Sequence, residues 1–153
     1  MNLYTYFVKI DNIERSVLSF LEPGSAFTKG FTGKSVIGFL KQTDKGVLPE
    51  NIVYNPDFIE IFKRAIKIAA LDSPDLESAA TSQQNGFIYI IDRRSKNNDE
   101  TKSKDIIGSF EVTQGQLNDE SFQFNPNYQI ISSEGIFQLP EDFEKVLLKE
   151  IEE

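Results

Sequence analysis

A short polar stretch, FTKGFTGKS (27–35), carries residues that a phosphate-binding loop would use. It ends in Gly33-Lys34-Ser35, the tail of the pattern G-x-x-x-x-G-K-[ST], in which backbone amides wrap the phosphates and the lysine reaches them. The pattern needs glycine five residues before Gly33, and the residue there is Thr28. The next residues, VIGFL, predict a strand where such a loop would open a helix. The sequence therefore disfavours a nucleotide site and leaves a flexible loop with some anion affinity.

Two arginines follow the most apolar segment of the chain. Asp92, Arg93 and Arg94 come directly after FIYII (87–91). Strand ends often carry ligand-binding groups, and paired arginines can clamp a carboxylate or a phosphate. We therefore take these three residues as candidate binding residues. A surface ion-pair cluster is the favoured alternative, and its acidic members would be Asp99, Glu100 or Asp105.

Acidic residues offer a second candidate site. Glu141, Asp142 and Glu144 stand at the start of the last predicted helix, where they complement the helix dipole and could also meet a basic partner. Among the other acids, Glu50 and Glu120 recur at matching positions of the internal repeat described below, and Asp105 and Glu111 flank one predicted strand. No D-x-D, E-x-x-E or calcium-loop pattern includes these last four acids, so a solvated surface is their default interpretation, and no metal site is predicted.

Several kinds of chemistry are excluded by composition. The chain has no Cys and no His, which rules out disulfides, thiolate nucleophiles, Ser-His-Asp catalysis and the usual structural zinc sites. Neither S-x-x-K nor G-x-S-x-G occurs. The sequence therefore favours a non-catalytic protein, with no cofactor.

The charge is uneven along the chain. Residues 1–76 contain nine basic and nine acidic residues, whereas residues 77–153 contain seven and fifteen, so the net charge of −8 lies in the second half. An acidic half repels nucleic acid and attracts a basic protein partner. The alternative is a soluble surface that binds no partner, because net charge is first of all an indicator of solubility.

Hydropathy gives no sign of a membrane segment. The N-terminus lacks a charged n-region followed by an apolar run, and no apolar run reaches the roughly 18 residues that a membrane span needs. The sequence therefore predicts a cytoplasmic protein with no membrane partner.

The elements that would position these residues follow from periodicity and breakers. Predicted strands lie at 3–10, 36–40, 87–91 and 106–112, with short extended segments ending near 124 and 131. Predicted helices lie at about 12–21, 56–69, 73–85 and 140–151. The 87–91 strand is apolar throughout, which predicts a central strand buried on both faces. Residues 95–105 are polar and predict an exposed loop.

An internal repeat organises these elements. Residues 36–58 match residues 106–128 without a gap, with six of twenty-three positions identical, including the glycines Gly38 and Gly108 and the Asn-Pro pairs that begin at Asn55 and Asn125. Each copy also follows a strand that ends in Asp, at Asp11 or Asp92. We interpret this as a duplication that gives half-repeats of about 1–72 and 86–153, sharing one sheet. Chance similarity is the alternative.

These observations predict one α+β domain over residues 1–153, with a mixed or largely antiparallel sheet of five to seven strands and three to four helices. The favoured function is a non-catalytic binding protein that engages a basic protein partner through the acidic half. A bacterial immunity or inhibitor-type protein is one concrete form. The alternatives are a small-molecule-binding protein or enzyme with a cleft between the halves, and a structural homodimer.

Overall fold

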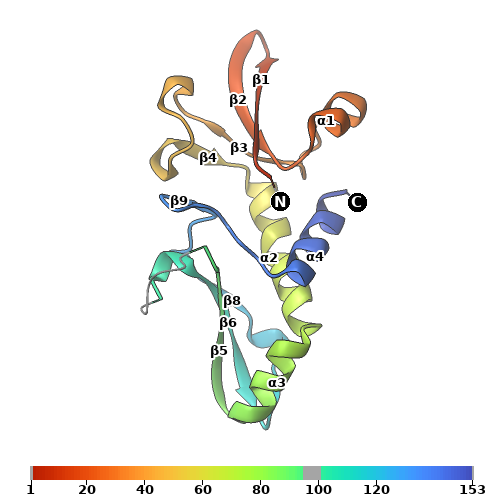
Figure 1. The fold of residues 1–153 in the computed structure, drawn as a ribbon, viewed down its shortest axis with the longest axis vertical. Coiled ribbons are helices and arrows are strands. Elements are labelled where there is room, and N and C mark those ends of the chain that lie inside the picture. Colours follow the sequence, from red (N-terminus) through yellow and green to blue (C-terminus); the bar gives the residue numbers. More distant parts are fainter. Residues whose placement is uncertain (1, 95–100, 153) are drawn as a thin grey trace. The chain divides into compact units, whose positions relative to one another are not determined.

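The structure is a computed structural model that describes residues 2–94 and 101–152. It has an α+β architecture, as predicted (Figure 1). The chain divides into two compact units: unit 1 comprises Met1–Phe62 and Leu147–Glu153, and unit 2 comprises Lys63–Val146. Each unit has its own antiparallel sheet, so the prediction that the two halves share one sheet is wrong. Most of the loop predicted at 95–105 lies outside the described residues.

Unit 1 contains a four-stranded antiparallel sheet in the order β1-β2-β3-β4. Its strands are β1 (Tyr4–Ile10), β2 (Ile13–Ser19), β3 (Val36–Leu40) and β4 (Ile52–Tyr54). The helices that begin in unit 1 are α1 (Pro23–Lys29), the 3-10 turns η1 (Thr43–Lys45) and η2 (Pro49–Asn51), and α2 (Pro56–Leu71). Phe58 and Phe62 on α2 are fully buried, and the Phe58 ring lies 6.0 Å from the Phe20 ring. Aromatic rings therefore form part of the core of unit 1.

The helix predicted at 12–21 is wrong, because these residues form strand β2. Asp11 and Asn12 both adopt left-handed backbone conformations (φ 53° and 67°), and Ile10 pairs with Ile13 across them. Two left-handed residues make the tight hairpin turn whose twist matches antiparallel strands. A capping-box spacing that begins at Asp11 therefore belongs to a turn between two strands.

Unit 2 is built on a second antiparallel sheet, in which β5, β6 and β7 are neighbours in that order and β8 also pairs with β6. Its strands are β5 (Gly86–Ile91), β6 (Ile106–Thr113), β7 (Gln116–Leu117) and β8 (Gln123–Phe124), with a separate pair β9 (Ile131–Ser132) and β10 (Gly135–Ile136). Its helices include α3 (Pro74–Gln83), the 3-10 turns η3 (Ser103–Asp105) and η4 (Asp119–Ser121), and the start of α4 (Glu141–Glu152). Ala80 of α3 packs with Ile88 and Val112 of the sheet.

The 87–91 strand is not central, which corrects the sequence prediction. Among the strands that the structure describes, β5 lies at the edge of its sheet and pairs only with β6. Phe87, Tyr89 and Ile91 are 57%, 56% and 43% exposed, whereas Ile88 and Ile90 are buried. The strand therefore has one buried face, one open apolar face and one side without a neighbouring strand.

Two segments that are seventy residues apart make the same hydrogen bonds. The main-chain N–H of Asn55 donates to the Ile37 carbonyl (2.8 Å), and that of Asn125 donates to the Ile107 carbonyl (2.9 Å). Each side-chain amide also donates to two carbonyl oxygens at 2.6–2.8 Å; these belong to Gly33 and Val36 for Asn55, and to Ser103 and Ile106 for Asn125. Asn55 therefore bonds the segment before β3 to the end of β4, and Asn125 bonds the segment before β6 to the end of β8.

The strand registers agree at the same spacing. Gly38 of β3 lies opposite Tyr54, and Gly108 of β6 lies opposite Phe124. The register also equates β2 with β5, because Leu18 lies opposite Gly38 as Ile90 lies opposite Gly108. The counterpart of β5 is thus β2, and the sequence-based alignment of β5 with the strand ending at Asp11 is wrong.

The two segments continue differently. After Asn55 the chain enters the long helix α2, whereas after Asn125 it makes a turn and reaches the short strand β9. Among the residues described, none of the helices combines the length and apolarity that crossing a bilayer would require.

Candidate functional site

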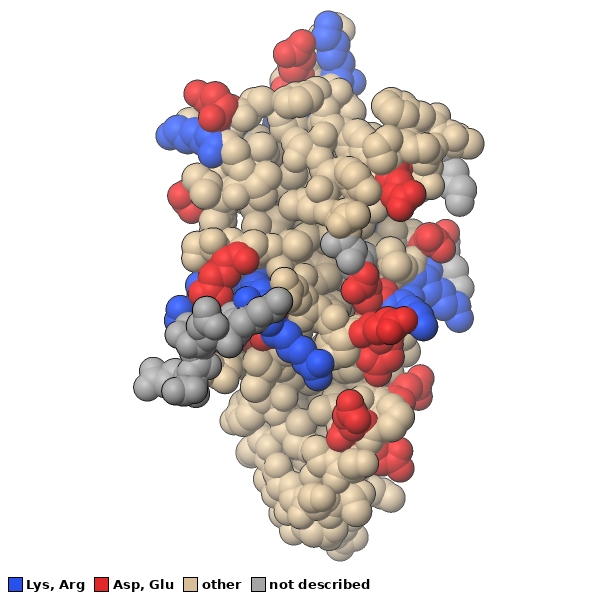
Figure 2. All heavy atoms as spheres, in the orientation of Figure 1, with Lys and Arg blue, Asp and Glu red and all other residues tan. Residues whose placement is uncertain are grey.

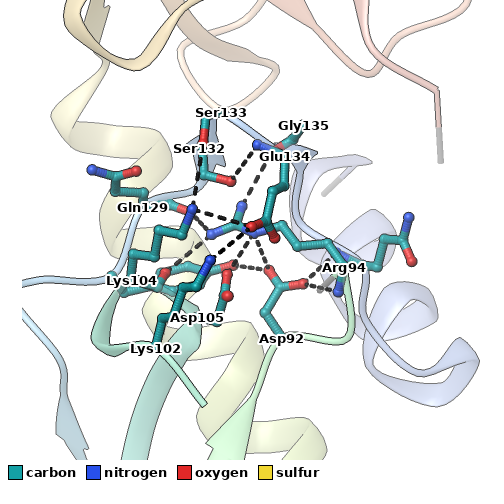
Figure 3. Close-up of polar contacts among 12 residues, drawn as sticks. Asp92, Arg94, Lys102, Lys104, Asp105, Gln129, Ser132, Ser133, Glu134 and Gly135 are labelled. Atoms are coloured by element: carbon teal, nitrogen blue, oxygen red, sulfur yellow. Dashed lines mark hydrogen bonds and ion pairs between the residues drawn. The ribbon is translucent and has the colours of Figure 1, made fainter. Parts of the chain in front are cut away.

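Arg94 is the centre of a buried polar cluster in unit 2 (Figure 3). Its side chain is enclosed, and Nε donates to Asp105 Oδ1 at 2.9 Å. The two terminal nitrogens donate to main-chain carbonyls, and these acceptors belong to Ile130 (3.0 Å), Gly135 (3.2 Å), Lys104 (3.0 Å) and Gln129. A guanidinium has five N–H donors, and all five have an acceptor here. Arg94 therefore has no donor left for a ligand.

Asp92 completes this cluster from the end of β5. Its Oδ1 accepts hydrogen bonds from the main-chain N–H groups of Arg94 (3.0 Å) and Gln138 (2.9 Å). Its Oδ2 accepts one from the Tyr128 hydroxyl (2.6 Å) and lies 3.7 Å from the Arg94 Nε. Burial raises the pKa of Asp92, and the hydrogen bonds from Tyr128 and Gln138 and the Arg94 charge oppose that rise. Asp92 and Arg94 thus hold separate segments of unit 2 together through hydrogen bonds.

The Tyr128 hydroxyl predicts a specific alkaline behaviour. Burial, and then the neighbouring Asp92 carboxylate, raise the pKa of Tyr128 well above its ordinary value of 10.0. Above pH 10 the unfolded chain loses a proton that the folded chain keeps, so stability falls as pH rises. At pH 8 we expect the free energy of unfolding of the wild type to exceed that of Tyr128→Phe by about 1.5–3 kcal/mol. This advantage should shrink by up to about 1.4 kcal/mol per pH unit above pH 10.

Urea unfolding at pH 8 and pH 11 measures this difference. Tyr89→Phe is the matched control, because the Tyr89 side chain is 56% exposed and no hydrogen bond to its hydroxyl is seen among the described residues. Its effect should be small and equal at both pH values. An advantage over Tyr128→Phe that stays the same at pH 8 and pH 11 would contradict the assignment.

The other four predicted site residues occupy different environments at the surface. Arg93 is exposed, and its main-chain N–H donates to the Gln138 carbonyl (3.2 Å). Glu141 pairs with Lys145 one helical turn along α4 (3.3 Å), and both are exposed. Asp142 is exposed, whereas Glu144 is half-buried. Arg93 and Asp142 line one pocket, so the structure brings together one residue from each predicted set.

That pocket has a volume of about 330 Å³ and lies within unit 2. It is lined by Ser73, Asp75 and Leu76 at the start of α3, by Tyr89, Ile90, Ile91 and Arg93 on and after β5, and by Pro140, Asp142 and Phe143 at the start of α4. Successive side chains of a strand point to opposite faces. Because residues 89, 90 and 91 all contribute, the pocket lies at the edge of β5.

Main-chain hydrogen bonds show which β5 groups face this edge. Asp92 N–H donates inward to the Asp105 carbonyl next to β6 (2.7 Å). The Phe87 carbonyl accepts a hydrogen bond from Gln83 Nε2 (2.9 Å), and the Arg93 N–H donates one to the Gln138 carbonyl. The main-chain N–H and C=O groups of the odd-numbered residues here therefore point away from β6. Tyr89 and Ile91 share that parity. Within residues 2–94 and 101–152 no hydrogen bond reaches their outward N–H and C=O groups.

Two acidic side chains, Asp75 and Asp142, line the pocket, and the helix turns that carry them hold further acidic residues. The first turn of α3 carries Asp75 and Glu77, and the first turn of α4 carries Glu141, Asp142 and Glu144. Figure 2 shows acidic atoms gathered over α3 and the first turn of α4. Arg93 is the basic residue of the lining. The site therefore combines an apolar interior, an acidic rim and unused main-chain groups.

The Gly33-Lys34-Ser35 segment lies in unit 1 as a turn before β3, in which the Ser35 N–H donates to the Thr32 carbonyl (3.1 Å). A cavity of about 510 Å³ beside it is lined by Lys34 together with the acidic side chains of Asp57, Glu60 and Glu152. Three carboxylates against one lysine disfavour a phosphate. Among the described residues no group of three or more acidic side chains is arranged to hold a metal ion.

Known proteins give no guide here. Neither a protein-family model, nor a curated protein, nor a solved structure matches this chain. The functional argument therefore rests on the geometry of unit 2.

Sequence reasoning missed most of the pocket. It singled out Arg93 and Asp142 but not Leu76, Tyr89 or Phe143. The Pro74 helix start was visible, and the alternation of burial along β5 was hidden because both of its faces are apolar in sequence. Only the strand order shows that β5 has an open edge.

Proposed function

We propose that this chain is a non-catalytic binding protein that engages a basic protein partner through the acidic rim of unit 2. One observation carries the proposal: an apolar pocket at an open strand edge is bordered by the acidic first turns of α3 and α4. Apolar lining with a few polar groups is typical of ligand sites. An acidic rim selects partners with lysine or arginine next to the apolar group, and it speeds their association.

The internal cluster supports a binding role over catalysis. Asp92, Arg94, Asp105 and Tyr128 are buried ionisable groups of unit 2, and each is hydrogen-bonded to another of them or to the main chain. The pocket lining itself contributes Asp75, Asp142 and Arg93 as its charged groups. Charged groups at the rim of an interface act mainly through steering and selectivity.

The prediction of an immunity or inhibitor-type protein is a finer form of this proposal. In that form the captured partner is an enzyme, and the purified chain suppresses its activity. A homodimer through the β5 edge is the alternative, and the acidic rims of two copies would oppose it.

We further propose that residues 36–58 and 106–128 descend from one duplicated segment. The identical strand registers and the two asparagine hydrogen-bond sets support this origin.

The binding proposal is tested by reversing the charge of the rim. Asp75→Lys with Asp142→Lys should weaken capture of a partner from the native cytoplasm, and with the purified partner should raise Kd about 100-fold at low salt. Titration calorimetry measures that change. Added salt should weaken wild-type binding, because the Debye length falls to about 8 Å at 0.15 M.

The matched control is Asp119→Lys with Glu120→Lys. These acids lie in the first turn of η4, are exposed, and do not line the pocket, yet their reversal changes net charge equally. A partner whose affinity drops as much with the control pair responds to overall charge, and that result would remove the pocket from the proposal.

A further inference from the structure

We propose that the occupant of this site is an extended segment of the basic partner, which adds to unit 2 as an antiparallel strand along the free edge of β5. The inference rests on the proposed function and specifies its binding mode. Strand addition uses main-chain hydrogen bonds for affinity and side-chain pockets for selectivity. The β5 edge offers both.

The hydrogen-bonding capacity of the edge is limited to a short window. Gln83 occupies the Phe87 carbonyl at one end, and Gln138 occupies the Arg93 N–H at the other. Between them, Tyr89 and Ile91 direct their N–H and C=O groups outward. At about 3.4 Å per residue, an added segment on the order of five residues would span this window.

Unit 1 contains the corresponding edge in its occupied form. The sheet register equates β2 with β5, and in unit 1 the far side of β2 is covered by β1. There Tyr4 lies opposite Ser19 and Tyr6 lies opposite Val17, in antiparallel pairing. In unit 2 the described residues supply no such strand. The same sheet plan thus has an antiparallel neighbour in one unit and an open position in the other.

The side chains around the window define the chemistry of the segment. In a strand, alternate side chains would point to the open sheet face, where Phe87, Tyr89 and Ile91 are exposed, and to the pocket side, where Leu76 and Phe143 lie. Asp75 and Asp142 border the pocket and favour lysine or arginine on that segment. A short sequence that alternates basic and β-branched residues fits both requirements.

An acetylated and amidated octapeptide of alternating Lys and Val is the probe. On binding, it should slow hydrogen exchange of the Tyr89 and Ile91 amides by about tenfold or more, because both N–H groups gain acceptors. An alternating Lys-Gly peptide carries the same charge without the apolar side chains and should bind more weakly. An alternating Glu-Val peptide should not bind, because the rim is acidic.

A backbone variant adds a second readout. Ile91→Pro removes an outward N–H and no donor to β6, and proline is tolerated at such edge positions. It should weaken binding of the Lys-Val peptide about three- to tenfold. Unchanged exchange at Ile88 and Ile90, whose N–H groups face β6, verifies that the variant keeps its sheet.

The outcomes separate the two proposals. Binding of both basic peptides with no protection at Tyr89 and Ile91 would overturn strand addition and leave the acidic binding face standing. No binding of either basic peptide at low salt would count against both. Protection of these amides that grows with protein concentration alone would show that a second copy of the chain takes this edge, and would overturn the partner-segment inference.

Discussion

Arg94→Met should lower the free energy of unfolding of unit 2 by about 3–5 kcal/mol, the usual cost of removing one partner from a buried ion pair. The substitution keeps an unbranched side chain of similar length but removes all five donors. Asp105 would then be buried without its ion-pair partner, and its Oδ2 already lacks a hydrogen-bond partner among the described residues. Four main-chain carbonyl oxygens would lose a donor as well.

The adjacent Arg93→Met is the matched control. Arg93 is exposed, and the hydrogen bond seen for it among the described residues comes from its main-chain N–H, so its replacement should change stability by less than about 0.5 kcal/mol. Native-state hydrogen exchange at the Phe110 amide in β6 reports the opening of unit 2. Equal effects of the two variants would mean that the Arg94 cluster adds nothing beyond surface charge.

The second large effect concerns Gly38. A Cβ at this position would lie 2.3 Å from the Val53 carbonyl oxygen and 3.0 Å from the Tyr54 Cα, which are main-chain atoms of β4. Gly38→Ala therefore forces β4 away from β3, and we expect a loss of about 3 kcal/mol in the stability of unit 1. Hydrogen exchange of the Ile37 amide at increasing urea concentrations measures this loss of stability.

The stability loss of Gly38→Ala can be compared with the effects of alanine at two other glycines. A Cβ at Gly108 would lie 2.6 Å from the Gln123 carbonyl oxygen, so Gly108→Ala should destabilise unit 2 by a somewhat smaller amount, about 2 kcal/mol. A Cβ at Gly24 in α1 would meet no atom within 4 Å, so Gly24→Ala should be neutral or slightly stabilising. If all three substitutions cost the same, close strand approach is not the reason for glycine at Gly38.

Local signals in the sequence predicted α2, α3 and α4. Pro56 and Pro74 stand at the first turns of α2 and α3, and Ser73 caps α3 by accepting a hydrogen bond from the Leu76 N–H. Such positions are recognisable because proline and N-cap residues act on their own backbone. Pro23 follows the segment that was predicted as a helix at 12–21, and proline is common just after a helix, but in the structure Pro23 opens α1.

Non-local relations could not be predicted in the same way. The exposure of Phe87, Tyr89 and Ile91 depends on which strands lie beside β5, and an apolar sequence reads alike for a central strand and an open edge. The enclosure of Arg94 depends on carbonyl groups from residues 104, 129, 130 and 135, far along the chain. The sequence indicated that Arg94 could bind a ligand. It could not show that the guanidinium donates its hydrogen bonds to main-chain carbonyl groups of the protein itself.

The Arg94 guanidinium also acts as a cross-link in a chain that has no cysteine. It joins Arg94 to carbonyl groups 10, 35, 36 and 41 residues away, which are spans that a disulfide closes in many secreted domains. Unlike a disulfide, this junction is indifferent to reductants, and the guanidinium keeps its charge at any physiological pH. Because one side chain holds several segments, they should separate in a single cooperative step when unit 2 unfolds.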